Sequence, residues 1–146
     1  MTAQEDTKIS SLMRQIMLKK QSYVNHELEV AHGGLTAHQV MALMYIHRNP
    51  GIIQREIVTL TQRRAPTVSV MLKKFEQDHL IVRKVPKGNN RNKEIFLTAN
   101  GEEVVKEFQK VTAATDALAT TNLSTEQKVI LINLLSKMNG NLDTNM

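Results

Sequence analysis

The chain has 146 residues, 41% of them hydrophobic, a net charge of +5 and no cysteine. This length suits one well-cored domain over residues 1–146, and the lack of cysteine excludes disulfides, cysteine nucleophiles and thiolate metal sites. No run approaches the roughly 18 apolar residues of a membrane span, and the polar N-terminus lacks the order of a signal peptide, so we expect a cytoplasmic protein with no membrane partner.

The first predicted element is a long amphipathic helix over about residues 8–32. Its apolar residues recur with a 3.6-residue rhythm and have polar residues between them: Ile9, Leu12, Met13, Ile16, Met17, Val24, Leu28 and Ala31. We expect His32-Gly33-Gly34 to end this helix, because paired glycines supply the left-handed backbone that follows a helix.

Two shorter helices are predicted next. Thr36 and Gln39 have the spacing of a capping box, and Leu35 and Val40 have the spacing of a hydrophobic staple, so a second helix starts here and runs to Asn49-Pro50-Gly51. A third helix is predicted from Gln54 to about Leu60, followed by a turn over residues 61–65.

The fourth predicted helix begins at Pro66, which suits the first helical position. Val68, Met71, Leu72 and Phe75 form one apolar stripe at helical spacing. The opposite face is small, hydroxylated and cationic, with no acidic residue. Two helices joined by a short turn, the second with such a face, indicate a helix-turn-helix that enters a DNA major groove. The alternative is an ordinary solvated helix face.

A basic β-hairpin is predicted directly after this helix. Residues 80–85 are apolar and β-branched, residues 86–93 form a polar turn, and residues 94–97 return as a second strand. The turn carries Lys87, Arg91 and Lys93, which is typical of a wing, although a basic hairpin tip can also serve solubility alone.

Two more helices are predicted after the hairpin, and the first and last helices of the chain carry apolar surface that a small winged domain does not need. In the fifth helix Val104, Phe108, Val111, Thr115 and Leu118 recur at spacings of four and three, which suits a helix-helix seam. Ser124 and Gln127 offer another capping box, and the sixth helix is expected to end near Asn139-Gly140. We therefore expect a homodimer, because a two-fold dimer matches a pseudo-palindromic duplex site.

Positive charge is concentrated in the middle of the chain. Residues 48–93 contain eleven Lys and Arg against three Asp and Glu, a net charge of +8, so the remaining residues carry −3. Such a segment on a near-neutral scaffold indicates phosphate binding. The residues expected to contact DNA are Arg63, Arg64, Pro66, Thr67, Ser69, Val70, Lys73, Lys74, Lys87, Asn89, Asn90, Arg91 and Lys93. With only 3% aromatic residues, stacking on RNA or single strands is not expected.

The sequence also resembles the MarR family of bacterial transcriptional regulators over nearly its whole length. Residues 35–39 are similar to the family's Leu-Thr-x-x-Gln opening of the second helix. Residues 67–69, 75–76 and 80–83 resemble its recognition helix and the start of its wing. Asn89-Asn90-Arg91, Leu97-Thr98 and Gly101 resemble the wing motif Asp-Arg-Arg, the strand end and the glycine that follows.

This resemblance implies a mainly α fold with a small β-hairpin wing: a winged helix-turn-helix over about residues 36–98, and dimerisation helices over about 8–32 and 99–142. It further implies an obligate dimer, operator binding, and release by a small amphipathic or aromatic effector, with repression as the commoner outcome. Three residues depart from the family pattern. Asn89 replaces the wing aspartate, His79 replaces a glycine and predicts a less sharply left-handed turn, and Val70 stands where a polar residue is usual.

The sequence is less consistent with other functions. Histidines such as His26, His32 and His38 raise a zinc-responsive alternative, but no pair lies at i, i+4 and no cysteine is available, so solvated or satisfied histidines are favoured. No catalytic or phosphate-cradling motif is present, so we expect neither an enzyme nor a cofactor. A winged-helix module that binds proteins and not DNA remains an alternative. The methionines Met13, Met17, Met41 and Met44 either line an effector pocket between the first two helices or fill the core.

Overall fold

The computed structural model describes residues 2–31, 34–88 and 92–145, and within them it contains six helices and one β-hairpin. The elements follow the chain as α1 (Thr2–Ala31), α2 (Ala37–Arg48), α3 (Gln54–Thr61), α4 (Ala65–Gln77), β1 (Ile81–Lys84), β2 (Glu94–Leu97), α5 (Ala99–Ala119) and α6 (Thr125–Thr144). The predicted fold class, mainly α with a small hairpin wing, is confirmed.

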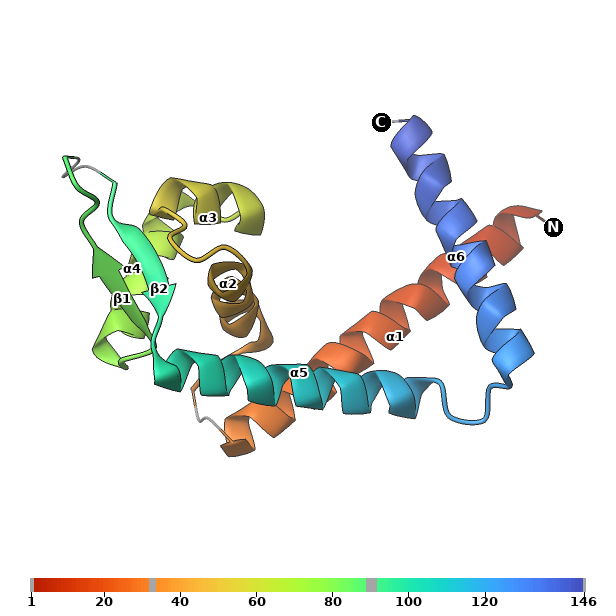
Figure 1. Cartoon of the computed structure of the whole chain (residues 1–146). Helices are drawn as coiled ribbons and strands as arrows, with labels where there is room; N and C mark the ends of the chain where they lie inside the picture. Colours follow the sequence, from red (N-terminus) through yellow and green to blue (C-terminus); the bar gives the residue numbers. More distant parts are fainter. Residues whose placement is uncertain (1, 32–33, 89–91, 146) are drawn as a thin grey trace.

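Two parts of the molecule are distinct in Figure 1. Helices α2, α3 and α4 and the hairpin form one unit, and α5 leaves this unit as a long rod. α1 crosses α5 and packs against it, while α6 rises from the far end of α5. Both chain termini therefore lie at the end of the molecule away from the hairpin.

The predicted apolar stripe of α4 forms the centre of the core. Val68, Leu72 and Phe75 are fully buried, and Met71 is partly buried against the same cluster. Leu43 of α2 and Ile57 of α3 are also fully buried. Since the core holds one face of α4, the opposite face is fixed toward solvent.

Both predicted capping boxes are present, whereas the predicted end of the last helix is not. The Thr36 hydroxyl accepts from Gln39 N at 3.3 Å, and Gln39 Oε1 accepts from Thr36 N at 3.0 Å, so the predicted capping box is present. Ser124 and Gln127 make the same pair of hydrogen bonds. The predicted end at Asn139-Gly140 is wrong, because Gly140 continues the helix and the chain leaves it only after Thr144.

α1 also begins earlier than predicted, at Thr2 and not near residue 8. The apolar rhythm starts only at Ile9, but a helix can extend over polar residues of good propensity. Glu5 lies in the first turn, where a negative side chain interacts favourably with the helix dipole.

The turn after α4 is sharper than the sequence predicted. His79 has a φ of +58°, so it adopts the left-handed conformation although it is not glycine. Histidine is among the residue types enriched there, and two hydrogen bonds hold the turn: Leu80 N donates to Phe75 O at 2.8 Å and the Thr98 hydroxyl donates to His79 O at 2.5 Å.

The wing is a two-stranded antiparallel hairpin in which Ile81 pairs with Leu97 and Lys84 with Glu94. β1 is one residue shorter at each end than predicted. The loop between α2 and α3 extends this sheet, because Ile95 N donates to Ile52 O at 2.9 Å and Gly51 N donates to Ile95 O at 2.9 Å. The base of the wing is thus fixed to the helix-turn-helix.

The start of α5 lies directly against the turn that ends α4. Besides its bond to His79, the Thr98 hydroxyl accepts from Gly101 N at 3.1 Å and caps α5. At Gly101 a Cβ would approach Leu80 O closer than the 3.0 Å that real Cβ atoms keep. Glycine at this position therefore permits the close contact between α5 and the turn that ends α4.

The rest of α5 packs on α1, as the predicted seam required. Val104, Phe108, Val111 and Thr115 are buried, but Leu118, the last residue of the predicted seam, is 58% exposed. Lys20 Nζ lies 2.5 Å from Asp116 Oδ1, which adds an ion pair between the two helices. No described helix is long and apolar enough to cross a membrane.

Candidate nucleic-acid interface

The outer face of α4 presents the side chains that the sequence predicted. Val70 is 69% exposed, and Pro66, Thr67, Lys73 and Lys74 are exposed beside it. Ser69 is half-buried. An aliphatic side chain this exposed gains nothing from the core, whereas in a major groove it can pack on a thymine methyl group.

The turn before α4 adds charge and open backbone donors. Arg63 and Arg64 are both exposed. Arg64 is the N-cap residue of α4, and its side chain makes no capping hydrogen bond. The first N–H groups of a helix have no partner within the helix and carry partial positive charge, so they favour a phosphate at this end.

The wing extends the cationic surface. Lys87 and Lys93 are exposed on either side of the tip. Asn89, Asn90 and Arg91 lie outside the described residues. Lys84 Nζ lies 5.1 Å from the centre of the Phe96 ring, an arrangement that holds this cation along the strand.

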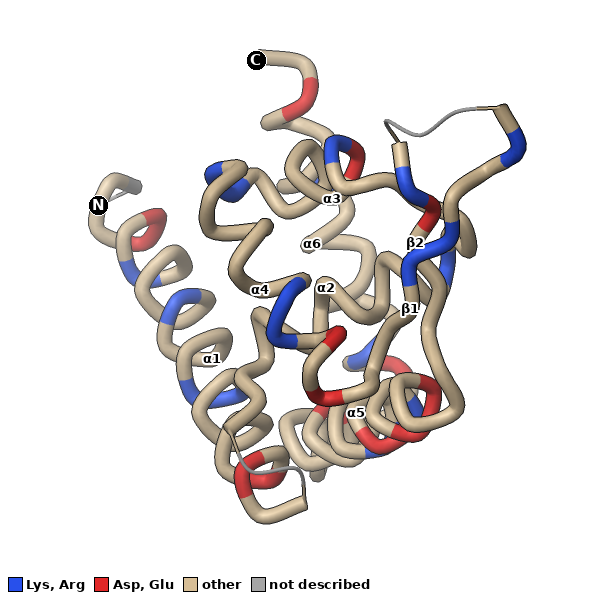
Figure 2. The backbone as a smooth tube through the Cα atoms, turned by 90° about the vertical axis from the view of Figure 1, so that its left-hand side faces the viewer, with Lys and Arg blue, Asp and Glu red and all other residues tan. Residues whose placement is uncertain are grey.

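Charge is distributed unevenly over the molecule. Figure 2 shows basic stretches along the turn before α4, along α4 itself and on the hairpin, whereas several acidic stretches gather along α5. A polyanion approaching the α4 and wing side therefore meets mainly positive charge, which speeds association and orients the protein.

Two cations on this side are already paired within the protein. Lys74 Nζ lies 3.1 Å from Asp78 Oδ2, one turn along α4, and both side chains are 46% exposed. An exposed pair of this kind contributes little to stability and can exchange for a phosphate. Arg83 Nε lies 2.6 Å from Glu76 Oε1, and the Arg83 side chain is only 17% exposed.

A hollow of about 540 Å³ opens beside the reading face, between α2, α3 and α4. Its lining combines apolar side chains, including Met41 and Met71, with the cations Arg63 and Lys74. Thr67 and Val70, both predicted DNA contacts, also line it. This hollow was not predicted from the sequence, because its walls come from three helices.

Comparisons with known proteins place this geometry in a family. A sequence profile described as the MarR family matches residues 33–91. The structure resembles that of the G34K mutant of S. aureus MepR, with a TM-score of 0.81 and 30% identity over 91% of this chain and 97% of that one. The chain belongs to the MarR family of transcriptional regulators.

Two further relatives of this MarR-family chain are informative. An S. aureus MepR–DNA complex matches with a TM-score of 0.72 and 29% identity, covering 90% of this chain and 96% of that one. The Escherichia coli O157:H7 transcriptional regulator HosA is 25% identical over 126 residues, which are 86% of this chain and 90% of HosA. These relatives are regulators, as the sequence predicted.

The methionines divide between the two roles that the sequence left open. Met44 is core, with 5% of its surface exposed, and Met41 lines the hollow. Met13 and Met17 do neither in this chain, since they are 40% and 64% exposed. Both residues lie on the exposed side of α1, so neither the effector pocket between α1 and α2 nor core filling describes them.

Two of the described histidines contact polar side chains. His38 Nε2 lies 2.9 Å from Gln21 Nε2, and His47 Nδ1 lies 2.8 Å from Glu102 Oε2. In the parts of the chain that the structure describes, no three His, Asp or Glu side chains are grouped as a metal site would require. His32 lies outside these parts.

Proposed function

We propose that this MarR-family protein binds a pseudo-palindromic operator in duplex DNA as a homodimer and represses transcription there. The observation that supports this most directly is the outer face of α4. It combines the exposed Val70 with exposed Thr67 and Lys73, while its buried face is fixed by the core. Such a helix can read base edges through its outer face and meet phosphates at its flanks.

In this arrangement α4 enters the major groove and the wing lies over the adjacent minor groove. Val70 reads a base pair through a thymine methyl group, while Arg63, Arg64 and Lys73 meet phosphates. Arg91 and Lys93 at the wing respond to groove width and negative potential more than to base identity. The MepR–DNA complex among the structural relatives supports duplex DNA as the partner.

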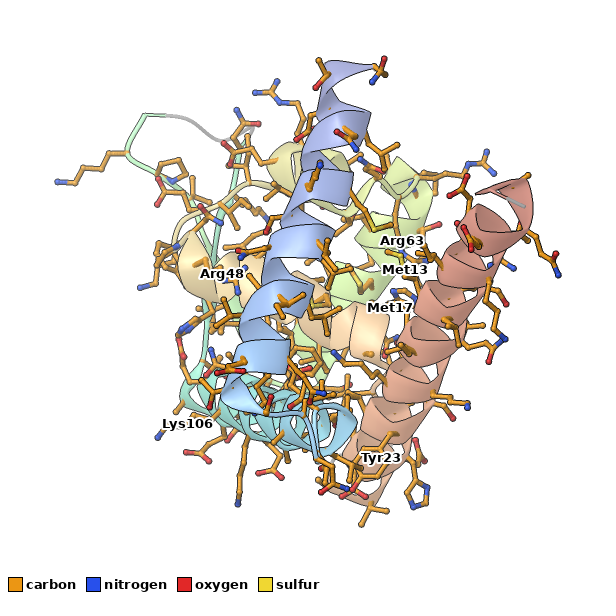
Figure 3. The ribbon with its side chains drawn as sticks, turned by 90° about the vertical axis from the view of Figure 1, so that its right-hand side faces the viewer. Met13, Met17, Tyr23, Arg48, Arg63 and Lys106 are labelled. Atoms are coloured by element: carbon orange, nitrogen blue, oxygen red, sulfur yellow. The ribbon has the colours of Figure 1, made fainter. Side chains whose placement is uncertain are left out.

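The homodimer is supported by the apolar surface of α1 and α6. Every described residue of α6 is at least partly exposed, and seven of its large apolar side chains are 40–64% exposed: Val129, Ile130, Leu131, Ile132, Leu134, Leu135 and Leu142. Figure 3 shows Met13 and Met17 on the side of α1 that lies toward α6 in this view. A soluble monomer rarely exposes so much contiguous apolar surface, so a second copy is the natural cover.

Release by a small effector is the second part of the proposal. An amphipathic anion suits the hollow between α2, α3 and α4, since Met41 and Met71 offer an apolar wall and Arg63 and Lys74 offer positive charge. Because Thr67 and Val70 belong to the lining and to the reading face, effector and DNA compete for the same surface. Effector affinity should therefore be lower for the DNA complex than for the free protein.

The proposal is tested by selecting binding sites from a random duplex pool and titrating the selected site at several salt concentrations. A protein with about 6 to 10 phosphate contacts loses about 10³ to 10⁵ in affinity between 50 and 200 mM salt. A winged-helix module that binds only proteins would select no site, and its weak affinity for duplexes would not depend on their sequence. A stable monomer in sedimentation would contradict the dimer.

A further inference from the structure

Arg83 connects the wing to both helices of the helix-turn-helix. It is the third residue of β1, and its Nε lies 2.6 Å from Glu76 Oε1 in the last turn of α4. Its Nη1 donates to Gln54 Oε1, in the first residue of α3, at 3.2 Å. One guanidinium thus contacts both helices of the helix-turn-helix from a strand of the wing.

We propose that Arg83 is a positioning residue that fixes the wing relative to α4, and not a phosphate ligand like its basic neighbours. This inference rests on the proposed reading of DNA by α4 and the wing. The Arg83 side chain is 17% exposed and its charge is paired with Glu76. A phosphate contact would require breaking a partly buried ion pair, which is costly when one charge remains behind.

The wing needs such a connection because its own sheet is small. β1 and β2 have four residues each, and a two-stranded hairpin is marginally stable by itself. The turn after α4 holds one end of β1, through the hydrogen bond from Leu80 N to Phe75 O. The bridge between Ile52 and Ile95 attaches β2, and Arg83 adds an attachment on β1 itself, which restrains β1 from rotating about that turn.

Arginine suits this role better than lysine does. Its five donors lie in a rigid plane and can reach two partners at once, whereas the lysine ammonium is a compact charge on a flexible chain. Arg83 Nε–H is not aligned with Glu76 Oε1 as in a regular hydrogen bond. The attraction to Glu76 is therefore mainly between charges, and an uncharged glutamine would not restore it.

Glu76 and Asp78 provide a matched pair of variants. Both carry one negative charge at the end of α4, but only Glu76 pairs with Arg83, while Asp78 pairs with the exposed Lys74. Removing an acidic charge from a DNA-binding surface should strengthen binding by electrostatics alone. If charge alone matters, Glu76→Gln and Asp78→Asn should both strengthen operator binding. If Glu76 positions the wing through Arg83, Glu76→Gln should weaken it.

The experiment measures dissociation constants of the full-length wild type and variants on the selected operator at several salt concentrations. We expect Asp78→Asn to bind as tightly as the wild type or more tightly. Glu76→Gln and Arg83→Gln should each bind the operator about 3- to 30-fold more weakly. This is the range over which residues that do not touch a ligand change its binding affinity. The salt slopes of both variants should equal that of the wild type, and the double variant should lose no more than the weaker-binding single variant.

A second measurement separates positioning from a general loss of folding. Lys93→Ala removes a wing cation, and its effect on affinity should be smaller in the Glu76→Gln background, where the wing is no longer held in place. Ser69→Ala on α4 should have the same effect in both backgrounds. Since Glu76 is 42% exposed, Glu76→Gln leaves the core intact even if Arg83→Gln fails to fold.

Tighter operator binding by Glu76→Gln, matching Asp78→Asn, would overturn the positioning role. A salt slope lowered by about one in Arg83→Gln would instead identify Arg83 as a phosphate ligand and would also overturn it. If the wild type binds no duplex site at all, the proposed function itself fails, an outcome distinct from both.

Discussion

Gly101→Ala is expected to destabilise the protein by forcing α5 away from the turn that ends α4. The added Cβ would lie inside van der Waals distance of Leu80 O and 3.1 Å from Leu97 Cδ2. The opposing atom is a backbone oxygen, so no side-chain rotation relieves the clash. Overpacking costs about 1 to 3 kcal/mol, and the upper end of this range is expected where the backbone must move.

Two further effects modify this magnitude. Alanine is a better helix former than glycine by at most about 1 kcal/mol, which offsets part of the cost. Separation of the two segments also strains the hydrogen bond from the Thr98 hydroxyl to His79 O. We therefore expect a net loss of roughly 2 kcal/mol, or about 5 to 10 °C in the midpoint of thermal unfolding.

The matched control is Gly140→Ala in α6. No atom lies within 4 Å of a Cβ placed at Gly140, and its φ is not left-handed. The same substitution should there be neutral or stabilise by about 0.4 to 1 kcal/mol. Both variants are compared with the wild type by thermal unfolding at one protein concentration, because the stability of a dimer depends on concentration. Equal midpoints for Gly101→Ala and the wild type would refute the close packing of α5 on the α4 turn.

Four other predictions concern the interface, the dimer, the caps and oxidation. Val70→Ala should relax base preference at one symmetric pair of operator positions, at a cost of about 1 to 3 kcal/mol, without changing the salt slope of binding. Lys73→Ala should instead lower that slope by about one. Titrations of single-base operator variants distinguish the two effects, and an unchanged base preference in Val70→Ala would show that Val70 does not read bases. Leu134→Lys should convert the proposed dimer to monomers in analytical ultracentrifugation, because it places a charge in the apolar surface of α6; an unaffected dimer would place the interface away from α6. Thr36→Ala should reduce the free energy of unfolding by about 1 kcal/mol in urea titrations, since it removes the hydroxyl that caps α2; no change would mean that the cap is replaced by solvent. Mild peroxide should not cause a loss of operator binding that dithiothreitol reverses, because the chain has no cysteine; such a reversible loss would contradict this.

The sequence by itself determined which elements form, though not all of their ends, and which face of α4 is exposed. The stripe of Val68, Leu72 and Phe75 predicts which side is buried, and burial of that side directs Val70 to solvent. The capping boxes at Thr36 and Ser124 were equally predictable. All these signals act between residues at most seven positions apart, so local periodicity and backbone hydrogen bonding are enough to read them.

The tertiary structure alone decided how these elements restrain one another. In the sequence Arg83 is one more cation of a basic segment. Its partners Glu76 and Gln54 lie 7 and 29 positions away, and the packing of β1 on two helices brings them to it. The hollow beside α4 and the contact between Gly101 and Leu80 O have the same origin. Spacing along the chain determines which face of a helix is apolar. The neighbour that each side chain contacts depends instead on the angles at which the elements pack, because the core as a whole sets those angles.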